Sequence, residues 1–264
     1  MTSENKDYEY KGLMAIYWDL LRGDTSQWAD RFYYKDVIQA SGGPVLDVGC
    51  GTGRLLLDYL SEGVDIDGVD NSPDMLAICR EKAAQRGLQP ALYLQEMESL
   101  DLPRKYRTML VPSSSFQLLV EPAAAQVALN RFFEHLEQGG TLVMSLMVLW
   151  TGATEGETAQ EDWNVVGEMP RPEDGALVRR WSRSTYDLRQ QLEHTEDRYE
   201  LLKDGEIVFS EEHSRSPATR WYTQEQAITL LKEAGFTAIQ LNKEFTHKPA
   251  SPEDTLFTIQ GVRP

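Results

Sequence analysis

A glycine-rich segment early in the chain is the part of the sequence best suited to holding a ligand. In Asp47-Val48-Gly49-Cys50-Gly51-Thr52-Gly53, glycine occupies every second position after the acid. Glycine lets a backbone turn tightly, and it lets a ligand approach without meeting a Cβ atom. An apolar run precedes the segment and a helical pattern follows it, so the glycines predict a ligand loop between a strand and a helix.

The spacing of the glycines bears on which ligand the loop takes. A dinucleotide site prefers G-x-G-x-x-G, with a pyrophosphate at the helix N-terminus. Here the third glycine, Gly53, comes one residue early, and Asp47 stands before the loop. This pattern favours an adenosyl ligand without phosphates, and it makes a nicotinamide oxidoreductase a more distant alternative.

The elements around the loop repeat a strand and helix alternation, which predicts a doubly wound α/β fold with helices on both faces of a mostly parallel sheet. A second unit runs through Asp70, with Ser72-Pro73 as a helix start. Expected strands are residues 44–48, 65–70, 91–95, 108–111 and 141–147. Expected helices are two short ones within 12–39, then 54–60, 75–86 and 122–136.

The composition changes after Trp150, where a Gly, Thr and Glu-rich loop over 151–156 precedes alternating stretches typical of antiparallel strands. Asp204-Gly205 between two such stretches is a hairpin signal. A helix over 223–235 and strands over 236–241 and 255–262 then return to the main sheet. We therefore expect one domain, 1–264, comprising a helical cap (1–40), a ligand-binding core (41–147), an inserted antiparallel lobe that caps the substrate (148–222) and a return to the core (223–264).

Charge and composition narrow the classes of partner. The formal net charge is −16 and the pI about 4.7, which disfavours nucleic acid because phosphates are held by clustered Lys and Arg. The longest apolar run is strand length and residues 1–10 lack a secretory signal, so no membrane contact and no secretion are expected. Cys50, Cys79 and the four histidines show no disulfide or zinc spacing, which predicts a cytoplasmic protein without a metal.

The segment from Val45 to Arg54 resembles motif I of class I S-adenosylmethionine-dependent methyltransferases. The likeness continues through Gly68-Val69-Asp70-Asn71-Ser72, Glu96-Met97, Val111 to Gln117 and Gly139-Gly140, over roughly residues 10–147, and is closest to a small-molecule branch. The resemblance implies a seven-stranded sheet, with S-adenosylmethionine as cofactor and S-adenosylhomocysteine as product. Arg107 departs from the family, which often carries an acid there, and the departure bears on packing more than on catalysis.

The resemblance also assigns roles around the cofactor. Asp70 would accept hydrogen bonds from the ribose hydroxyls, Glu96 would lie near the adenine amino group and Met97 would cover the ring. Tyr17 and Tyr34 would cover the methionine part, although ordinary core aromatics explain both equally well. The full set of expected cofactor residues is Tyr17, Tyr34, Asp47, Gly49, Cys50, Gly51, Gly53, Asp70, Asn71, Met75, Glu96, Met97 and Pro112.

No residue stands out as a catalytic base. Methyl transfer can be accelerated largely by positioning, and a base matters only when the acceptor keeps its proton at neutral pH. His135 precedes a Gly-Gly turn and is expected to be structural. Candidate acceptor contacts, for which packing or a surface position is an equally good explanation, are Ser115, Gln117, Trp150, Arg220 and Tyr222.

Three functions remain open beside the oxidoreductase. The first is methylation of a nitrogen or oxygen of a small molecule, favoured because the inserted lobe would exclude a macromolecule. The second makes the acceptor a protein side chain, attracted by the acidic surface. The third is a cofactor-binding scaffold without activity, because a fold does not establish chemistry. The sequence leaves a monomer and a homodimer equally open.

Overall fold

The computed structural model describes residues 10–151 and 158–264, and the chain folds as two compact units. We call residues 24–151 with 221–264 the core unit, and residues up to 23 with 152–220 the antiparallel unit. The N-terminal stretch 1–40 therefore contributes one helix to each unit. The expected loop over 151–156 lies, apart from Thr151, outside the described residues.

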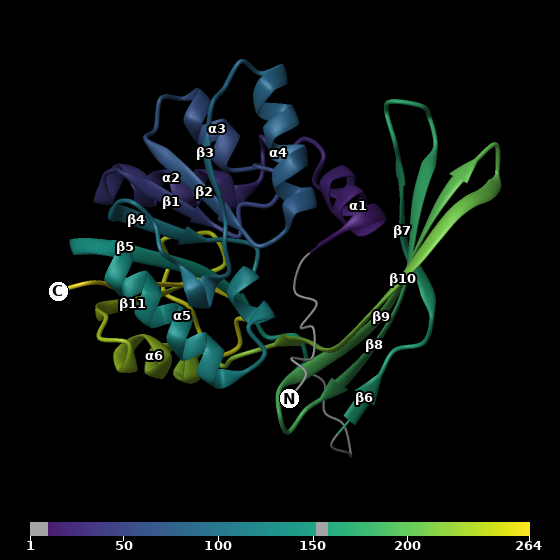
Figure 1. The fold of residues 1–264 in the computed structure, drawn as a ribbon. Coiled ribbons are helices and arrows are strands. Elements are labelled where there is room, and N and C mark those ends of the chain that lie inside the picture. Colours follow the sequence, from purple (N-terminus) through teal and green to yellow (C-terminus); the bar gives the residue numbers. More distant parts are fainter. Residues whose placement is uncertain (1–9, 152–157) are drawn as a thin grey trace, which may run out of the picture. The chain divides into compact units, whose positions relative to one another are not determined.

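The core unit contains a mostly parallel seven-stranded sheet, which confirms the expected fold class (Figure 1). The strand order is β11-β12-β5-β4-β1-β2-β3, and β12 runs antiparallel to both of its neighbours. The strands are β1 (Val45–Val48), β2 (Ile66–Asp70), β3 (Ala91–Leu94), β4 (Tyr106–Val111), β5 (Leu136–Met147), β11 (Thr237–Lys243) and β12 (Leu256–Val262).

Two helices of the core unit begin at residues whose side chains cap them. The Ser72 hydroxyl accepts a hydrogen bond from Met75 N at 3.1 Å, and Pro73 occupies the first turn. Thr223 and Gln226 form a reciprocal capping box. The helices are α2 (Ala29–Ser41), α3 (Leu56–Ser61), α4 (Pro73–Gln85), α5 (Pro122–His135) and α6 (Gln224–Glu233), with short 3-10 turns η1 (Met97–Ser99) and η2 (Ser115–Leu118).

Alternation along the strands buries both faces of this sheet. In β4, Met109 and Val111 pack in one apolar cluster with residues of α5 and α6. Leu110, between them, packs in a second cluster with residues of α2, α3 and α4. Successive strand side chains point to opposite faces, so β4, in the middle of the sheet, is buried on both sides. The parallel strands β1, β2, β3 and β4 therefore present their carboxyl ends at one edge, where the glycine loop leaves β1.

Of the element boundaries that differ from the expected ones, two lie in glycine-rich segments. Helix α3 begins at Leu56 instead of Arg54, because the loop continues as turns through Leu55. Strand β5 begins at Leu136 and includes the Gly-Gly pair that was expected to precede it. Arg107 stabilises this region by donating to Ser41 O at 3.0 Å and to Gln138 O at 2.8 Å. The basic residue thus satisfies two backbone carbonyls at the position where the family often has an acid.

The antiparallel unit contains a five-stranded sheet and one helix. Its strands are β6 (Thr158–Gln160), β7 (Asn164–Pro170), β8 (Leu177–Asp187), β9 (Leu192–Lys203) and β10 (Glu206–Arg220). Asp204 and Gly205 both have positive φ and form the β9–β10 hairpin, as expected. Helix α1 (Gly12–Arg22) packs Leu13, Met14 and Tyr17 against Val178 and Tyr199 of this sheet. Across residues 10–151 and 158–264, no helix is long and apolar enough to cross a membrane.

Candidate functional site

The glycine loop folds over the carboxyl end of β2. The backbone N–H groups of Gly49 and Cys50 both donate to Val69 O, at 2.8 and 3.0 Å. Gly49, Gly51 and Gly53 have φ values of 70°, 54° and 84°, a region that other residues enter only with strain. The shape of the loop therefore depends on these glycines.

The three glycines have different surroundings. A Cβ atom on Gly53 would lie 2.6 Å from the Cys79 sulfur, so this glycine permits close packing of the loop on α4. A Cβ on Gly49 would lie 2.9 Å from the Ser115 hydroxyl oxygen and 3.7 Å from the Met97 methyl carbon. A Cβ on Gly51 would meet nothing within 4 Å. Gly51 is thus the position where the backbone faces open space and a ligand can approach it.

Asp70 at the end of β2 holds a carboxylate beside that open space. Its Oδ2 accepts from Gly51 N and its Oδ1 from Ser72 N, both at 2.8 Å. Burial raises the pKa of Asp70, while the N–H groups of Ser72, Gly51 and Asn71 act in the opposite direction. Asp70 therefore links the glycine loop to β2 and places an acceptor where the family uses one for ribose hydroxyls.

Asp47, at the carboxyl end of β1, is the second acid of the site. Its side chain is almost completely buried, and its Oδ1 has no hydrogen-bond partner among the described residues. Burial raises the pKa of Asp47 to about 7; the positive charge of Arg54 lowers it and the negative charge of Asp70 raises it. A buried carboxylate oxygen without a partner is costly unless something polar or cationic reaches it.

Three observations fit S-adenosylmethionine, which carries a ribose and two positive charges. Asp70 offers a carboxylate, Gly51 offers open backbone and Asp47 offers a buried oxygen that lacks a partner. Asp70 and Asp47 would hold the cofactor's polar groups, and the glycines would let it lie against the chain. The residues present therefore fit the cofactor that the sequence resemblance implies.

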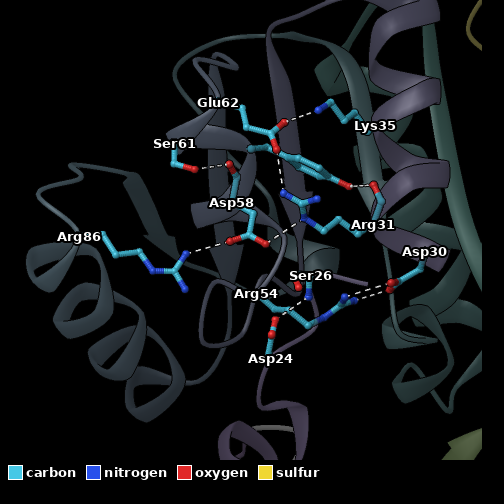
Figure 2. Close-up of polar contacts among 11 residues, drawn as sticks. Asp24, Ser26, Asp30, Arg31, Lys35, Arg54, Asp58, Ser61, Glu62 and Arg86 are labelled. Atoms are coloured by element: carbon cyan, nitrogen blue, oxygen red, sulfur yellow. Dashed lines mark hydrogen bonds and ion pairs between the residues drawn. The ribbon is translucent and has the colours of Figure 1, made fainter. Parts of the chain in front are cut away.

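Arg54 and Asp30 are site residues that the sequence reasoning missed. Arg54 directly follows the loop, and its two terminal nitrogens bind both carboxylate oxygens of Asp30 on α2, at 3.2 and 2.5 Å (Figure 2). The guanidinium also lies over the Trp28 ring, 5.3 Å from its centroid. Arg54 is the last residue of the segment that resembles motif I. No local signal in the sequence marks Asp30, because an acid on a helix is usually exposed to solvent.

The remaining expected cofactor residues have varied positions. In the core unit, Met97 is half-buried near Gly49, Glu96 is exposed and Pro112 is buried after β4. Met75 and Asn71 lie around the start of α4, Met75 being buried. Cys50, within the glycine loop, is buried, and its sulfur packs against Gly68 of β2.

The two tyrosines expected beside the cofactor lie in different units. Tyr34 is completely buried on α2 beside Tyr33 and Phe245, whose ring centroids lie 5.7 and 6.0 Å from its own. Tyr17 lies on α1 in the antiparallel unit, and its ring centroid is 5.6 Å from that of Tyr199. Their contacts with the methionine part of the cofactor stay predictions.

The candidate acceptor contacts already have protein partners. The Ser115 hydroxyl donates to Pro112 O at 2.8 Å. The buried Gln117 amide donates to Met147 O at 2.9 Å and accepts from Met147 N at 2.7 Å, so it joins η2 to the end of β5.

Of the other three candidates, two lie in the core unit. Tyr222 is buried with its ring centroid 6.0 Å from that of Phe116, and Trp150 is half-buried. Arg220, in the antiparallel unit, donates to Gln190 O at 2.7 Å. Contact between any of the five candidates and an acceptor remains a prediction.

The structure gives His135 a structural role. Its Nε2 accepts from Leu102 N at 3.1 Å, and its Nδ1 lies 2.8 Å from Arg131 O. An Nε2 that accepts leaves the proton on Nδ1, which then donates to that carbonyl. In the described parts of the chain, no three His, Cys, Asp or Glu side chains are grouped so as to hold a metal ion.

Comparison with known proteins identifies the segment that carries this site. Residues 45–140 match the family described as a methyltransferase domain. A Geobacillus sp. (strain WCH70) protein provisionally named a methyltransferase is 26% identical over 216 residues, covering 81% of this chain and 83% of that relative. The matched segment contains the glycine loop, Asp47 and Asp70.

Solved structures share the fold over nearly the whole chain. An S-adenosylmethionine-dependent methyltransferase from Clostridium acetobutylicum ATCC 824 has a TM-score of 0.71 at 19% identity, covering 94% of this chain and 96% of that one. The sugar N-methyltransferase KedS8 from Streptoalloteichus sp. ATCC 53650 has a TM-score of 0.64 at 24% identity, covering 93% and 92%. At these identities, the likeness is one of fold.

Proposed function

We propose that this chain, whose residues 45–140 match a methyltransferase domain, methylates a nitrogen or oxygen atom of a small-molecule acceptor. The chain is an S-adenosylmethionine-dependent methyltransferase by its family match and its fold. The acceptor class is the proposed part. The observation that carries the proposal is the Asp70 carboxylate bonded to Gly51 beside open backbone.

Two features support a small acceptor. The sugar N-methyltransferase named above shares the fold over 93% of this chain, which includes most of the antiparallel unit. The net charge of −16 disfavours an RNA or DNA acceptor. We further propose Ser115, Gln117, Trp150 and Tyr222 of the core unit as candidate acceptor contacts.

Methyl transfer requires mainly that the protein position the donor and the acceptor. When bound, S-adenosylmethionine would supply a methyl carbon on a positively charged sulfur. The C–S electron pair would stay on sulfur as the acceptor lone pair takes the methyl group, and any acceptor proton would leave to water. The chain must hold that carbon in line with the acceptor and exclude water, which accounts for large accelerations. Asp70 and the glycine loop orient the donor, and no covalent nucleophile is needed.

The test is turnover with methyl-deuterated S-adenosylmethionine and separate panels of amino sugars, small amines, phenols, basic proteins and tRNA. Mass spectrometry should detect deuterated methyl groups on a small molecule and release of S-adenosylhomocysteine. The Asp70→Asn variant, folded by circular dichroism, should lose most of this turnover. Labelling of protein or tRNA alone would overturn the proposed acceptor class.

A further inference from the structure

We propose that one face of the antiparallel sheet carries a binding site for a small organic anion, namely a carboxylate or phosphate ester that also bears a hydroxyl or amino group. Arg215 and Thr195 would hold the anionic group, and Asp197 would accept from the hydroxyl or amino group. The site consists only of residues of the antiparallel unit. The inference goes beyond the proposed function and does not depend on the identity of the methyl donor.

Strand pairing gathers the side chains of this site on one face. Thr195, Asp197 and Tyr199 occupy alternate positions of β9 and therefore point to the same side. Arg215 of β10 pairs directly with Thr195, and Arg180 of β8 pairs directly with Tyr199 (Figure 1). Directly opposite side chains start about 5 Å apart, and alternate residues of a strand about 7 Å apart. These five side chains form one contiguous group, which we call the β9 patch.

Two arginines share one buried carboxylate in the β9 patch. Arg180 donates from Nε and Nη2 to Asp197 Oδ1, at 2.9 and 2.8 Å. Arg215 Nη2 lies 3.5 Å from Asp197 Oδ2. The Asp197 side chain is 0% exposed, whereas those of Arg180 and Arg215 are 15% and 12% exposed. The patch therefore has one positive charge in excess and is not completely closed to solvent.

Two further acids on the same face are already bonded to other residues. Glu193 accepts from the Ser184 hydroxyl at 3.2 Å. Glu211 accepts from Met14 N at the start of α1, at 3.0 Å, and the same carboxylate oxygen lies 3.0 Å from His213 Nε2. These contacts leave the arginines of the β9 patch with a single carboxylate between them.

Four polar atoms of the β9 patch are buried without a hydrogen-bond partner among the described residues. They are Thr195 Oγ1, Asp197 Oδ2, Tyr199 Oη and Arg215 Nε. Thr195 and Tyr199 are only 4% and 0% exposed. Buried polar atoms are nearly always hydrogen-bonded, and one without a partner is destabilising. Four such atoms in one patch indicate a ligand that supplies the missing partners.

The kinds of atom that lack partners identify the class of ligand. Arg215 Nε can only donate, and its charge favours a carboxylate or phosphate oxygen. The Thr195 hydroxyl, directly opposite, can donate to the same group. Ionised Asp197 can only accept, so its free oxygen requires a hydroxyl or amino group, while Tyr199 can donate or accept. A ligand with an anionic group and a donor group about 7 Å apart satisfies all four atoms.

Ligand-observed NMR on the whole protein tests the site with matched probes, which are glucose 6-phosphate against glucose and glycerate against glycerol. At least one anionic probe should bind at about millimolar concentration, and its neutral counterpart should bind at least about tenfold more weakly. S-adenosylmethionine is left out, so the result is independent of turnover.

Tyr199→Phe and Thr195→Val remove the two unpartnered hydroxyls without breaking a hydrogen bond to a described residue. Each variant should weaken binding of the anionic probe by about two- to tenfold. The midpoint of thermal unfolding of the ligand-free protein should stay unchanged or rise, because a destabilising group has been removed. Unchanged probe binding together with a lower midpoint would show a purely structural role and contradict the inference.

Arg215→Gln removes the charge that would hold the anion and should weaken probe binding at least about tenfold. Arg183→Gln is the matched control, because Arg183 lies on the opposite face of β8 and its Nη2 donates to Glu196 at 2.5 Å. This control makes the same charge change and should leave probe binding unchanged. Equal binding of charged and neutral probes, or equal binding in the two variants, would overturn the inference.

Kinetics with a methyl acceptor distinguish two sources of the anion. If the acceptor carries it, Arg215→Gln should raise the KM of acidic acceptors and leave that of neutral acceptors unchanged. If a separate ligand carries it, Arg215→Gln should lose probe binding while every acceptor KM stays the same. Normal probe binding without any turnover would reject the proposed function and leave this site intact.

Discussion

Replacing Asp47 by Asn should stabilise the ligand-free protein at alkaline pH while weakening cofactor binding. Burial raises the pKa of Asp47 from its usual 3.8 to about 7. A raised carboxylate pKa means that the folded state binds the proton more tightly than the unfolded chain does. The stability from this group is therefore fully present below about pH 4 and is lost as the pH rises through about 7.

The size of the effect follows from the same values. At 1.36 kcal/mol per pKa unit, the rise from 3.8 to about 7 costs the folded protein up to about 4 kcal/mol above neutral pH. Asparagine has nearly the same shape and no charge, so Asp47→Asn should recover part of this cost. For a chain of 264 residues, each recovered kcal/mol should raise the midpoint of unfolding by about 2 to 4 °C.

Differential scanning calorimetry between about pH 5 and about pH 8.5 tests this prediction by measuring the midpoint of thermal unfolding. The difference in midpoint between variant and wild type should grow with pH and level off above neutrality. Asp101→Asn is the matched control, because Asp101 is exposed and should leave the midpoint unchanged at every pH. A variant less stable than wild type at the highest pH, or a difference independent of pH, would refute the reasoning.

Other predictions concern the loop and its supports. Asp70→Asn should weaken S-adenosylmethionine binding at least tenfold by calorimetry, because charged acceptors contribute about 1.5 to 3 kcal/mol per hydrogen bond. Gly53→Ala should lower the unfolding midpoint more than Gly51→Ala, because its methyl group would lie 2.6 Å from the Cys79 sulfur; Gly51→Ala should mainly weaken cofactor binding, and equal midpoints would contradict this packing. Gln117→Leu should cost about 1 to 3 kcal/mol in denaturant unfolding by orphaning two backbone groups of Met147; an unchanged denaturation midpoint would contradict that role.

Local signals explain the features that sequence reasoning predicted correctly. The cap at Ser72 and the hairpin at Asp204-Gly205 each depend on residues a few positions apart. The alternating glycines of the loop predict positive φ, because few other residues adopt it without strain. The parallel order of the sheet followed from the alternation of strands and helices. Such features are readable because their cause and their effect lie in one segment.

The missed features depend on contacts between distant segments. Asp30 pairs with Arg54, 24 positions away, and only the packing of α2 against the loop makes Asp30 a buried partner. The amide of Gln117 binds the backbone of Met147, 30 positions away. An acid on an amphipathic helix looks the same in the sequence whether it is buried in an ion pair or exposed to solvent, and so does an amide in a loop. No periodicity or spacing in the sequence distinguishes the buried case from the exposed one.

The charges at the site point to a conflict between stability and binding. Asp47 and Asp70 lie at the carboxyl ends of adjacent strands, and burial raises the pKa of both carboxyl groups. The negative charge of Asp70 raises the pKa of Asp47 further. A folded chain selected for stability alone would neutralise one of them. The positive charge of Arg54, which is bonded to Asp30, offsets part of that cost. A cationic ligand would offset more of that cost, so S-adenosylmethionine should stabilise the protein more than its neutral product does at equal ligand concentration.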